Sequence, residues 1–166
     1  RQPEMNLKFR PATEHDFSKV AQLVASADEL LLISPSSKFP WTAEQVEAIA
    51  GTRLHNTVAI DGDSQTITGF ANIYKATINQ TAFIGNVIIA PNYRQHGVGK
   101  QLMQYMMEIC QNQWYATPQV SVFNHNTDGL RFYHQLGFVP FAMEQREYGV
   151  KKLMLIHLKF IKKFVI

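Results

Sequence analysis

The sequence predicts an α/β (α+β) fold in which helices cover both faces of a mixed sheet. Segments with the apolar pattern of strands alternate along the chain with segments of helical periodicity. In the second half, strands are followed by helices, which is typical of a mixed sheet with covered faces. The segment Val87-Ile88-Ile89 is continuously apolar, as expected where a strand is buried on both sides.

We expect one domain spanning residues 1–166, because the chain has 166 residues and shows neither repeats nor a dividing linker. Residues 1–4, which precede Met5, are expected to be a tag or disordered. Hydrophobic residues make up 46% of the chain and charged residues 17%, which is ordinary for a globular protein. Its apolar runs are too short to span a bilayer, so we expect no membrane partner.

In the first half, a helix is expected to begin at Thr13 and to continue through the apolar positions as far as Ala27. Thr42, with Gln45 three residues later, predicts a second helix that ends near Leu54. A loop rich in proline and serine precedes it, and Asp61-Gly62-Asp63 has the composition of a turn. Strands are expected over residues 7–10, 57–60, 67–75 and 81–89.

In the second half, Pro91-Asn92-Tyr93 follows the strand over residues 81–89 and prevents it from continuing. Helices are expected from Gly97 to about Trp114 and from Thr127 to Leu136. The remaining strands are expected over residues 120–123, 138–143 and 150–160.

Gly97 and Gly99 lie where an apolar strand gives way to an amphipathic helix. A helix start exposes unpaired backbone N–H groups and the positive end of the helix dipole. Glycine allows the backbone to approach an anion closely, so this turn suits a diphosphate. Arg94 and Lys100 would add positive charge at its edge. The alternative is that the glycines only ease the turn from strand to helix.

Two nucleotide-binding motifs do not fit this turn. A dinucleotide-binding fingerprint requires a third glycine, and that position is Met103. A P-loop requires serine or threonine after Gly-Lys, and Gln101 stands there.

The spacing of two blocks resembles the GNAT superfamily of N-acetyltransferases. The first block is Arg94-x-x-Gly97-x-Gly99, and the second is Asn126-x6-Tyr133-x3-Gly137-Phe138. Together with Phe39-Pro40-Trp41-Thr42, the second block is most similar to enzymes that acetylate the N-terminal alanine of a ribosomal protein.

The resemblance implies a mostly antiparallel sheet of six to seven strands, splayed in the middle between the strand ending at Ile89 and the strand at Val120. Acetyl-CoA would bind in this opening as co-substrate, with the pyrophosphate on the glycine turn. Its pantetheine arm would pair with the backbone of the apolar strand. The expected cofactor-binding residues are Val87, Ile88, Ile89, Arg94, Gln95, His96, Gly97, Val98, Gly99, Lys100, Asn126 and Tyr133.

The resemblance also makes Tyr133 the expected catalytic residue, which would protonate the leaving thiolate. The phenol of tyrosine has an unperturbed pKa of about 10, so it is protonated at neutral pH and can donate. The alternative for Tyr133 is a packed aromatic beside Phe132 and Phe138. Asn126 could serve as the N-cap of its helix, contact the cofactor, or do both.

The general base is unassigned in the sequence. The similar enzymes carry a glutamate five residues before the asparagine, and here that position is Ser121. A serine hydroxyl takes up a proton poorly unless another group acts as its base. Asn86, through a bound water, and His125 are two further candidates, although His125 could be an exposed loop residue.

The resemblance places the amine acceptor between the loop 34–41 and the segment 145–149. Phe39, Trp41 and Tyr148 would form aromatic walls, Asn86 would contribute from the strand, and Glu144 and Glu147 would attract the amine. The alternative is that Phe39 and Trp41 anchor the second helix to the core. The acceptor would be a small-molecule amine, an amino-acid derivative or a peptide N-terminus.

The remaining expectations concern metals, partners and location. The six histidines lack paired ligand spacing, so no metal is expected, and the single cysteine, Cys110, is expected in the core. A reducing compartment, the cytoplasm, suits one cysteine. A net charge of +3 does not require nucleic acid. We expect a monomer or homodimer; the alternative to an enzyme is a non-catalytic acyl-CoA-binding sensor or interaction module.

Overall fold

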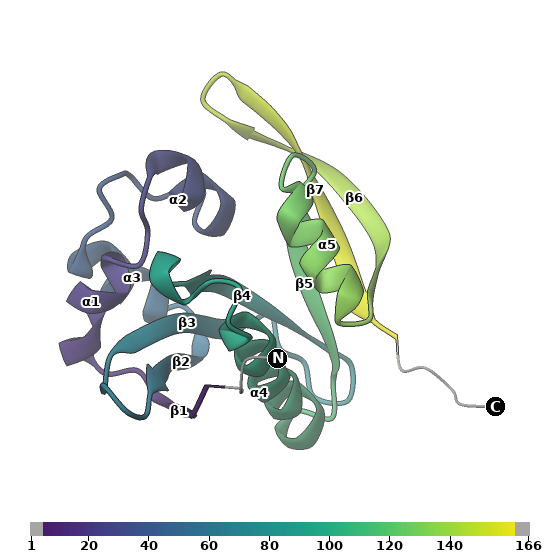
Figure 1. Cartoon of the computed structure of the whole chain (residues 1–166). Helices are drawn as coiled ribbons and strands as arrows, with labels where there is room; N and C mark the ends of the chain where they lie inside the picture. Colours follow the sequence, from purple (N-terminus) through teal and green to yellow (C-terminus); the bar gives the residue numbers. More distant parts are fainter. Residues whose placement is uncertain (1–4, 162–166) are drawn as a thin grey trace.

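Seven strands pair into one sheet in the order β1-β2-β3-β4-β5-β7-β6 in the computed structural model, which describes residues 5–161 (Figure 1). The expectation for residues 1–4 lies outside the described residues. All strand pairs are antiparallel except β4 with β5. The strands are β1 (Leu7–Pro11), β2 (Leu54–Asp61), β3 (Ile67–Tyr74), β4 (Thr81–Ile89), β5 (Thr117–Phe123), β6 (Phe138–Tyr148) and β7 (Lys151–Phe160).

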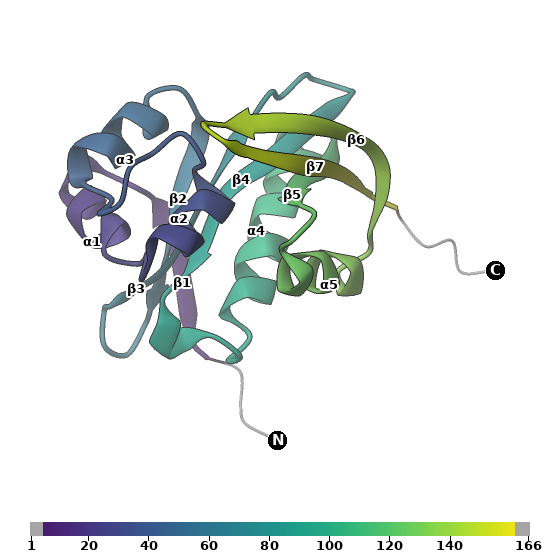
Figure 2. The same cartoon turned by 90° about the horizontal axis from the view of Figure 1, so that it is seen from above.

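Helices cover both faces of this sheet, which confirms the predicted fold class (Figure 2). Two helices pack on one face, where they share the larger hydrophobic core with the strands. Three short helices pack on the other face around a second core. The helices are α1 (Phe17–Ala21), α2 (Ala27–Ile33), α3 (Ala43–Ala50), α4 (Val98–Gln113) and α5 (Thr127–Gln135), with 3-10 turns η1 (Glu14–Asp16) and η2 (Pro91–Tyr93).

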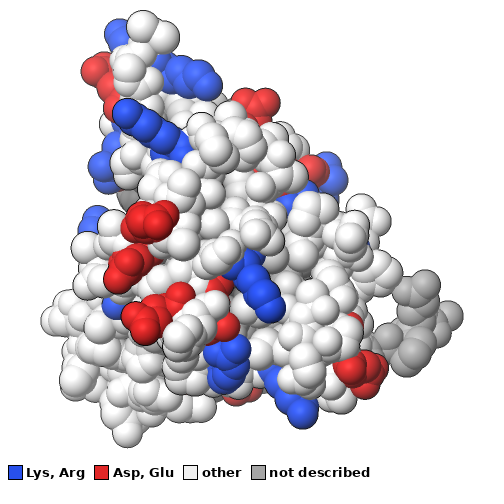
Figure 3. Space-filling view, turned by 90° about the vertical axis from the view of Figure 1, so that its left-hand side faces the viewer, with Lys and Arg blue, Asp and Glu red and all other residues white. Residues whose placement is uncertain are grey.

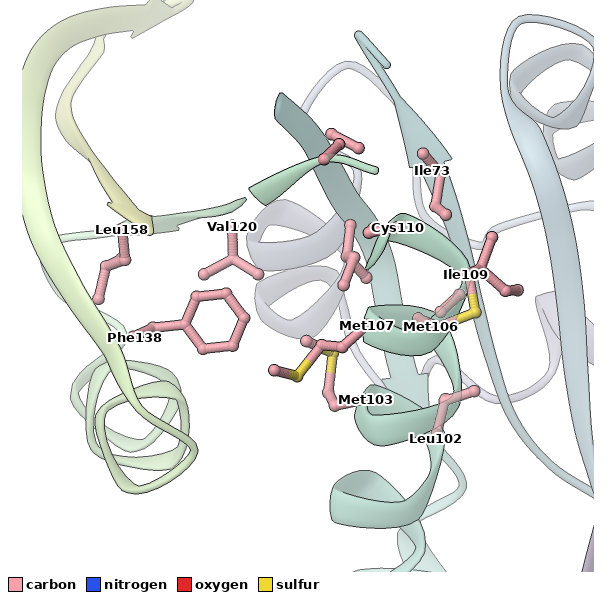
Figure 4. Packing of buried hydrophobic residues seen from close by; sticks show 14 of the residues in the cluster. Ile73, Leu102, Met103, Met106, Met107, Ile109, Cys110, Val120, Phe138 and Leu158 are labelled. Carbon is pink, nitrogen blue, oxygen red and sulfur yellow. The ribbon is translucent and has the colours of Figure 1, made fainter. Parts of the chain in front are cut away.

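The larger core is built on α4, whose apolar residues recur at helical spacing. Met103 and Met106 are fully buried and Met107 nearly so. Phe138, at the start of β6, is also fully buried and points toward these methionines from the far side of the sheet's opening (Figure 4). Flexible methionine side chains fill irregular space well, so they suit a core shared by two diverging halves of a sheet.

The first predicted helix is wrong in its extent. The helix expected from residue 13 to residue 27 ends at Ala21, and a separate helix, α2, begins at Ala27. Ser26 accepts a hydrogen bond from the backbone N–H of Glu29 (3.2 Å), and Glu29 accepts one from the N–H of Ala25 (2.8 Å). This reciprocal capping starts a new helix inside a segment whose apolar spacing predicted one continuous helix.

The second predicted helix begins where expected and ends earlier. Thr42 caps α3 by accepting a hydrogen bond from the N–H of Gln45 (3.2 Å), which confirms the predicted cap. The helix ends at Ala50 instead of Leu54, because Thr52 turns back onto the carbonyl of Ile49 through both its N–H and its hydroxyl. Residue Leu54 therefore begins β2.

Strand β6, the first strand of the β6–β7 hairpin, is longer than the strand predicted over residues 138–143. Strand β6 continues to Tyr148, which pairs with Lys151 across a turn containing Gly149 at φ +61°. Most of this extension is exposed on both of its faces, so it lacks the apolar alternation that identifies a strand in a sequence. The segment 145–149, which the resemblance places beside the amine acceptor, is strand and turn.

Charged side chains of both signs are interspersed over the face shown in Figure 3, and several Lys and Arg side chains lie at its top, where the β6–β7 hairpin projects. Within residues 5–161, no helix is both long enough and apolar enough to cross a membrane.

An ion pair fixes the chain between β1 and α1. Asp16 is buried, and Arg10 donates to its two carboxylate oxygens over 2.7 and 2.9 Å. The carboxylate also accepts the backbone N–H of Thr13 (2.8 Å). The hydrogen bond from Arg10 is the main reason that the pKa of Asp16 lies below its ordinary value.

We expect Asp16→Asn to lower the free energy of unfolding at pH 7 by about 1–2 kcal/mol, since a cap and a charged hydrogen bond are lost. Because folding lowers the pKa of Asp16, its stabilising effect is present above the unfolded value of 3.8 and is lost as the pH falls through the folded value. Urea unfolding at pH 7 and at pH 3 measures this. Exposed Glu14→Gln is the control, and an equal loss at both pH values would contradict the role of the carboxylate.

Candidate functional site

A cleft opens where β4 and β5 separate. The two strands pair only from Thr81 to Phe83, against Thr117 to Gln119. Beyond that point β5 pairs with β7 on its other side, and β4 pairs with β3 (Figure 1). The cleft has a volume of about 830 Å³ and is lined from both strands, α4 and α5. The predicted opening between the strand ending at Ile89 and the strand at Val120 is therefore confirmed.

A β-bulge shapes the β4 side of the cleft. Asn72 of β3 pairs with Gly85 and Phe70 with Ile88, so Asn86 and Val87 together stand opposite one residue. Asn86 has φ +48°, a conformation that asparagine tolerates better than most residues. A bulge bends its strand and leaves one residue outside the hydrogen-bonded ladder. The edge of β4 at the cleft therefore presents backbone N–H and C=O groups.

The N-terminus of α4 forms one end of the cleft. Gly97 lies at φ +81°, and a Cβ added to it would meet no atom within 4 Å. At Gly99, an added Cβ would meet the Phe132 ring at 3.2 Å, so this glycine allows α5 to pack closely against α4. The first glycine thus leaves open space before a helix start, and the second sets the distance between two helices.

The other predicted residues of this turn divide into two groups. Gln95 and Lys100 line the cleft with the glycines, whereas His96 is exposed outside the lining and the Val98 side chain is buried in the core. Arg94 lines the cleft but is already engaged: its Nε donates to the carbonyl of Ile89 (3.1 Å) and its guanidinium pairs with Glu29 of α2.

Helix α5 carries the second sequence block into the cleft. Asn126 caps the helix by accepting the N–H of Gly129 (2.9 Å), as expected for one of its two roles, and it also lines the cleft. Tyr133 lines the cleft two turns later. Its ring packs edge-on against Phe132 and Phe138. The packing interpretation of Tyr133 and its access to the cleft are therefore both correct.

Burial raises the pKa of the Tyr133 phenol, and the nearby Tyr74 raises it further. The phenol therefore stays protonated throughout the neutral range, as a proton donor must. A phenol with a raised pKa is a weak acid, so it would release its proton only as negative charge develops on an atom beside it.

No sequence pattern predicts the polar floor of the cleft. Arg53 lies over the ring of Tyr74, 4.1 Å from its centroid, and donates to Asn72 Oδ1 (3.1 Å). An added Cβ at Gly85 would meet Arg53 Nη1 at 2.5 Å and the Tyr74 ring at 2.7 Å. Burial lowers the pKa of Arg53. Neither residue belongs to a motif, and only the pairing of β2, β3 and β4 brings them together.

On the β5 side, Ser121, Tyr148 and Arg146 line the cleft. The Tyr148 ring packs edge-on against Phe123 at 5.8 Å between centroids. Arg146, which the sequence did not suggest, donates to Glu144 over 2.7 and 3.1 Å. The Ser121 hydroxyl lies 2.7 Å from His157 Nδ1.

Three sequence expectations do not fit their positions. Trp41 is 6% exposed within the second core, which fits the anchoring alternative, whereas the exposed Phe39 belongs neither to that core nor to the cleft lining. His125 is an exposed residue that packs on Phe123 outside the cleft lining.

Asn86 borders the cleft, but its side chain serves the fold. It is 7% exposed, its oxygen accepts from Asn72 (2.8 Å) and its nitrogen donates to the carbonyl of Ile33 (2.7 Å). It therefore connects the bulge to α2, because both ends of its amide have protein partners, and these contacts disfavour the water-relay role.

Cys110 lies in the core, as predicted, where burial raises the pKa of its thiol to about 12. A thiol with that pKa is not a nucleophile at neutral pH. Among the described residues, no three His, Cys, Asp or Glu side chains group together as metal ligands would.

Comparison with known proteins agrees with this geometry. The model of the Acetyltransferase (GNAT) family matches residues 25–138, more than half of the chain. Streptothricin acetyltransferase from Streptomyces lavendulae is 26% identical over 99 residues, which cover 60% of this chain and 51% of that enzyme. The chain thus spans about half the length of this curated relative.

Two solved structures share the fold. A GNAT family acetyltransferase from Elizabethkingia anophelis with acetyl-CoA bound has a TM-score of 0.66 and 19% identity, covering 93% of this chain and 97% of that one. The ribosomal-protein-S18-alanine N-acetyltransferase from Escherichia coli has a TM-score of 0.68 and 16% identity, covering 95% and 96%. Because the family model spans more than half of the chain and the whole sheet has this architecture, the chain belongs to the GNAT family of acetyltransferases.

Proposed function

We propose that this protein transfers an acetyl group from acetyl-CoA directly to a primary amine. The observation that carries the proposal is the cleft between β4 and β5, which has the start of α4 at one end and Tyr133 in its wall. Support for the donor comes from the family and from the solved relative that holds acetyl-CoA.

The residues of the cleft fit acetyl-CoA. The open space at Gly97 lies before a 16-residue helix, whose first N–H groups are unpaired and suit a pyrophosphate. Lys100 and Gln95 line the same end, and Arg94 could turn from Glu29 to a phosphate. The exposed His96 and the buried Val98 side chain would contribute only through their backbone.

The free edge of β4 provides the next part of the site. Backbone groups of Val87, Ile88 and Ile89 would pair with the amides of the pantetheine arm as a neighbouring strand does. At the bulge of Asn86 and Val87, a backbone N–H outside the hydrogen-bonded ladder would help to polarise the carbonyl of the thioester. Asn126 would contact the same arm from α5.

Acetyl-CoA would supply an activated acetyl thioester. Tyr133 would donate its phenolic proton to the sulfur as the carbon–sulfur bond breaks, since a free thiolate in this cleft is poorly solvated. The cleft would hold the amine and the thioester side by side, which removes most of the entropic cost of their encounter.

The acceptor would enter beside Tyr148, Arg146 and the Arg53–Tyr74 stack. An amine acceptor, small or peptidic, is compatible with relatives that act on streptothricin and on a ribosomal protein. A single domain over residues 1–166, a cytoplasmic location, the absence of a nucleic-acid partner and a monomeric or homodimeric state stay predictions.

The direct test incubates the purified protein with acetyl-CoA and a panel of primary amines and amino-terminal peptides, with thiol release as the readout. We expect amine-dependent thiol release by the wild type. Acetyl-CoA binding by calorimetry without turnover of any amine would favour the non-catalytic sensor, and absence of binding would refute both.

We expect Tyr133→Phe to lower kcat by about 100-fold, the lower range for loss of a general acid, because the thiolate must then leave unprotonated. The dissociation constant for acetyl-CoA should change less than threefold, since the ring and its packing remain. Exposed Tyr115→Phe is the control. An unchanged kcat for Tyr133→Phe would remove this residue from the chemistry.

Gly97→Ala tests the helix start against a matched control. Gly97 and Gly149 both have positive φ and open space around an added Cβ, so alanine at either site should cost about 1–2 kcal/mol of stability. Only Gly97→Ala should weaken acetyl-CoA binding, by about tenfold or about 1.4 kcal/mol. Thermal unfolding and calorimetry separate the two effects. Equal affinities of both variants would place the pyrophosphate elsewhere.

A further inference from the structure

A hydrogen-bonded chain of three side chains leads from the cleft to the solvent. It begins at Ser121, whose hydroxyl lies in the cleft lining and 2.7 Å from His157 Nδ1. It continues from His157 Nε2 to Glu144 Oε1 over 3.1 Å. Ser121 and His157 are directly opposed in the β5–β7 ladder, and Glu144 lies two residues after Ala142, the partner of His157 on β6.

The direction of these hydrogen bonds follows from the chemistry of the end group. The carboxylate of Glu144 can only accept, and the hydrogen bond from Arg146 helps to keep its pKa below the ordinary value. With His157 neutral, Nε2 must therefore carry the proton and Nδ1 must be the acceptor. The Ser121 hydroxyl then donates to Nδ1, which leaves its oxygen lone pairs available on the cleft side.

The surroundings of His157 favour one orientation of its ring. The ring of Phe83 on β4 packs edge-on at 5.9 Å and that of Phe141 on β6 lies at 6.3 Å. Its side chain is 18% exposed, whereas that of Glu144 is 44% exposed. The ionisable groups around the chain are Glu144 and Arg146 on β6 and Tyr74 on β3.

We propose that Ser121, His157 and Glu144 form the proton-accepting relay of the acetyl transfer. The inference rests on the proposed function. As the amine nitrogen forms its bond to the acetyl carbon, a proton passes from nitrogen to the Ser121 oxygen. The hydroxyl proton passes at the same time to His157 Nδ1, so serine ends uncharged and the imidazolium forms beside the carboxylate.

The other half of the balance lies at the leaving group. The carbon–sulfur bond breaks, and the sulfur takes the proton of Tyr133. The imidazolium returns its proton to solvent through the exposed side of Glu144, and the tyrosinate is reprotonated from solvent after the thiol leaves. Histidine suits this task because it gains and loses a proton readily near neutral pH. Ser121 cannot accept a proton usefully by itself, and His157 acts as its base.

The test compares Ser121→Ala, Ser121→Thr and His157→Gln in the thiol-release assay. We expect Ser121→Ala and His157→Gln to lower kcat at pH 7 by about 100-fold, with the KM for acetyl-CoA within threefold. Ser121→Thr keeps the hydroxyl and should restore most of the rate. Glutamine can bond to both neighbours of His157 but cannot take up a proton, so it separates a base from a structural link.

The pH profile provides the readout that a structural role would not change. With an acceptor amine that is neutral across the whole pH range tested, kcat/KM of the wild type should fall at low pH, because a protonated relay cannot accept the proton of the amine. In Ser121→Ala and His157→Gln, kcat/KM should be low and should lack this fall, because the relay no longer takes part. His125→Ala, an exposed histidine outside the cleft lining, should match the wild type.

The outcomes distinguish the relay from the acetyl transfer itself. Amine acetylation by the wild type with unchanged rates and profiles in both variants would overturn the relay and leave the proposed function in place. Mass spectrometry without acceptor should show no acetyl group on Ser121, because the relay forms no covalent intermediate. An acetylated Ser121 would overturn the relay in favour of covalent transfer. Inactivity of the wild type toward every amine would refute the proposed function first.

Discussion

The site depends on the point at which hydrogen bonding between two parallel strands stops. Strands β4 and β5 pair over three residues each, and beyond Phe83 their facing edges have no strand between them within the described chain. Backbone N–H and C=O groups at such edges require partners, either water or a ligand. A ligand that carries amides along an extended arm can form hydrogen bonds with both the N–H and the C=O groups. Acetyl-CoA has such an arm.

The bulge and the two cores together account for the opening. The extra residue at Asn86 and Val87 bends β4, and Asn86 is held there by Asn72 and by the carbonyl of Ile33. On the opposite face, the methionines of α4 and Phe138 fill the space where the sheet would otherwise close (Figure 4). The cleft is therefore supported by rigid packing on both faces of the sheet.

In the proposed mechanism, cofactor binding and proton transfer come from different halves of the molecule. The glycine turn and β4 would provide backbone groups, which can bind phosphate and amides without needing particular side chains. The half that contains β5, α5, β6 and β7 would provide Tyr133, Ser121 and His157 for proton transfer. This division explains why the donor side has a recognisable sequence motif, whereas the proton-accepting group is built from residues spread over three strands.

The sequence by itself determined the fold class, most strand positions and the glycine turn before α4, because these follow from local periodicity and local backbone requirements. The family resemblance of their sequence block also implied that Tyr133 and Asn126 would reach the cleft. The sequence misjudged the boundary at Ser26, where a local cap interrupted a continuous apolar pattern. It placed Trp41 in the acceptor site, although the side chain is buried in the second core.

Only the tertiary structure decided which side chains meet across strands. His157 stands opposite Ser121 because β5 pairs with β7, and Glu144 reaches the same imidazole because β6 pairs with β7 in one register. Sequence separations of 36 and 13 residues carry no periodic signal for such contacts. The sequence shows only that Ser121 stands where the similar enzymes have a glutamate. That His157 is the neighbour of Ser121 follows from the pairing of β5 with β7.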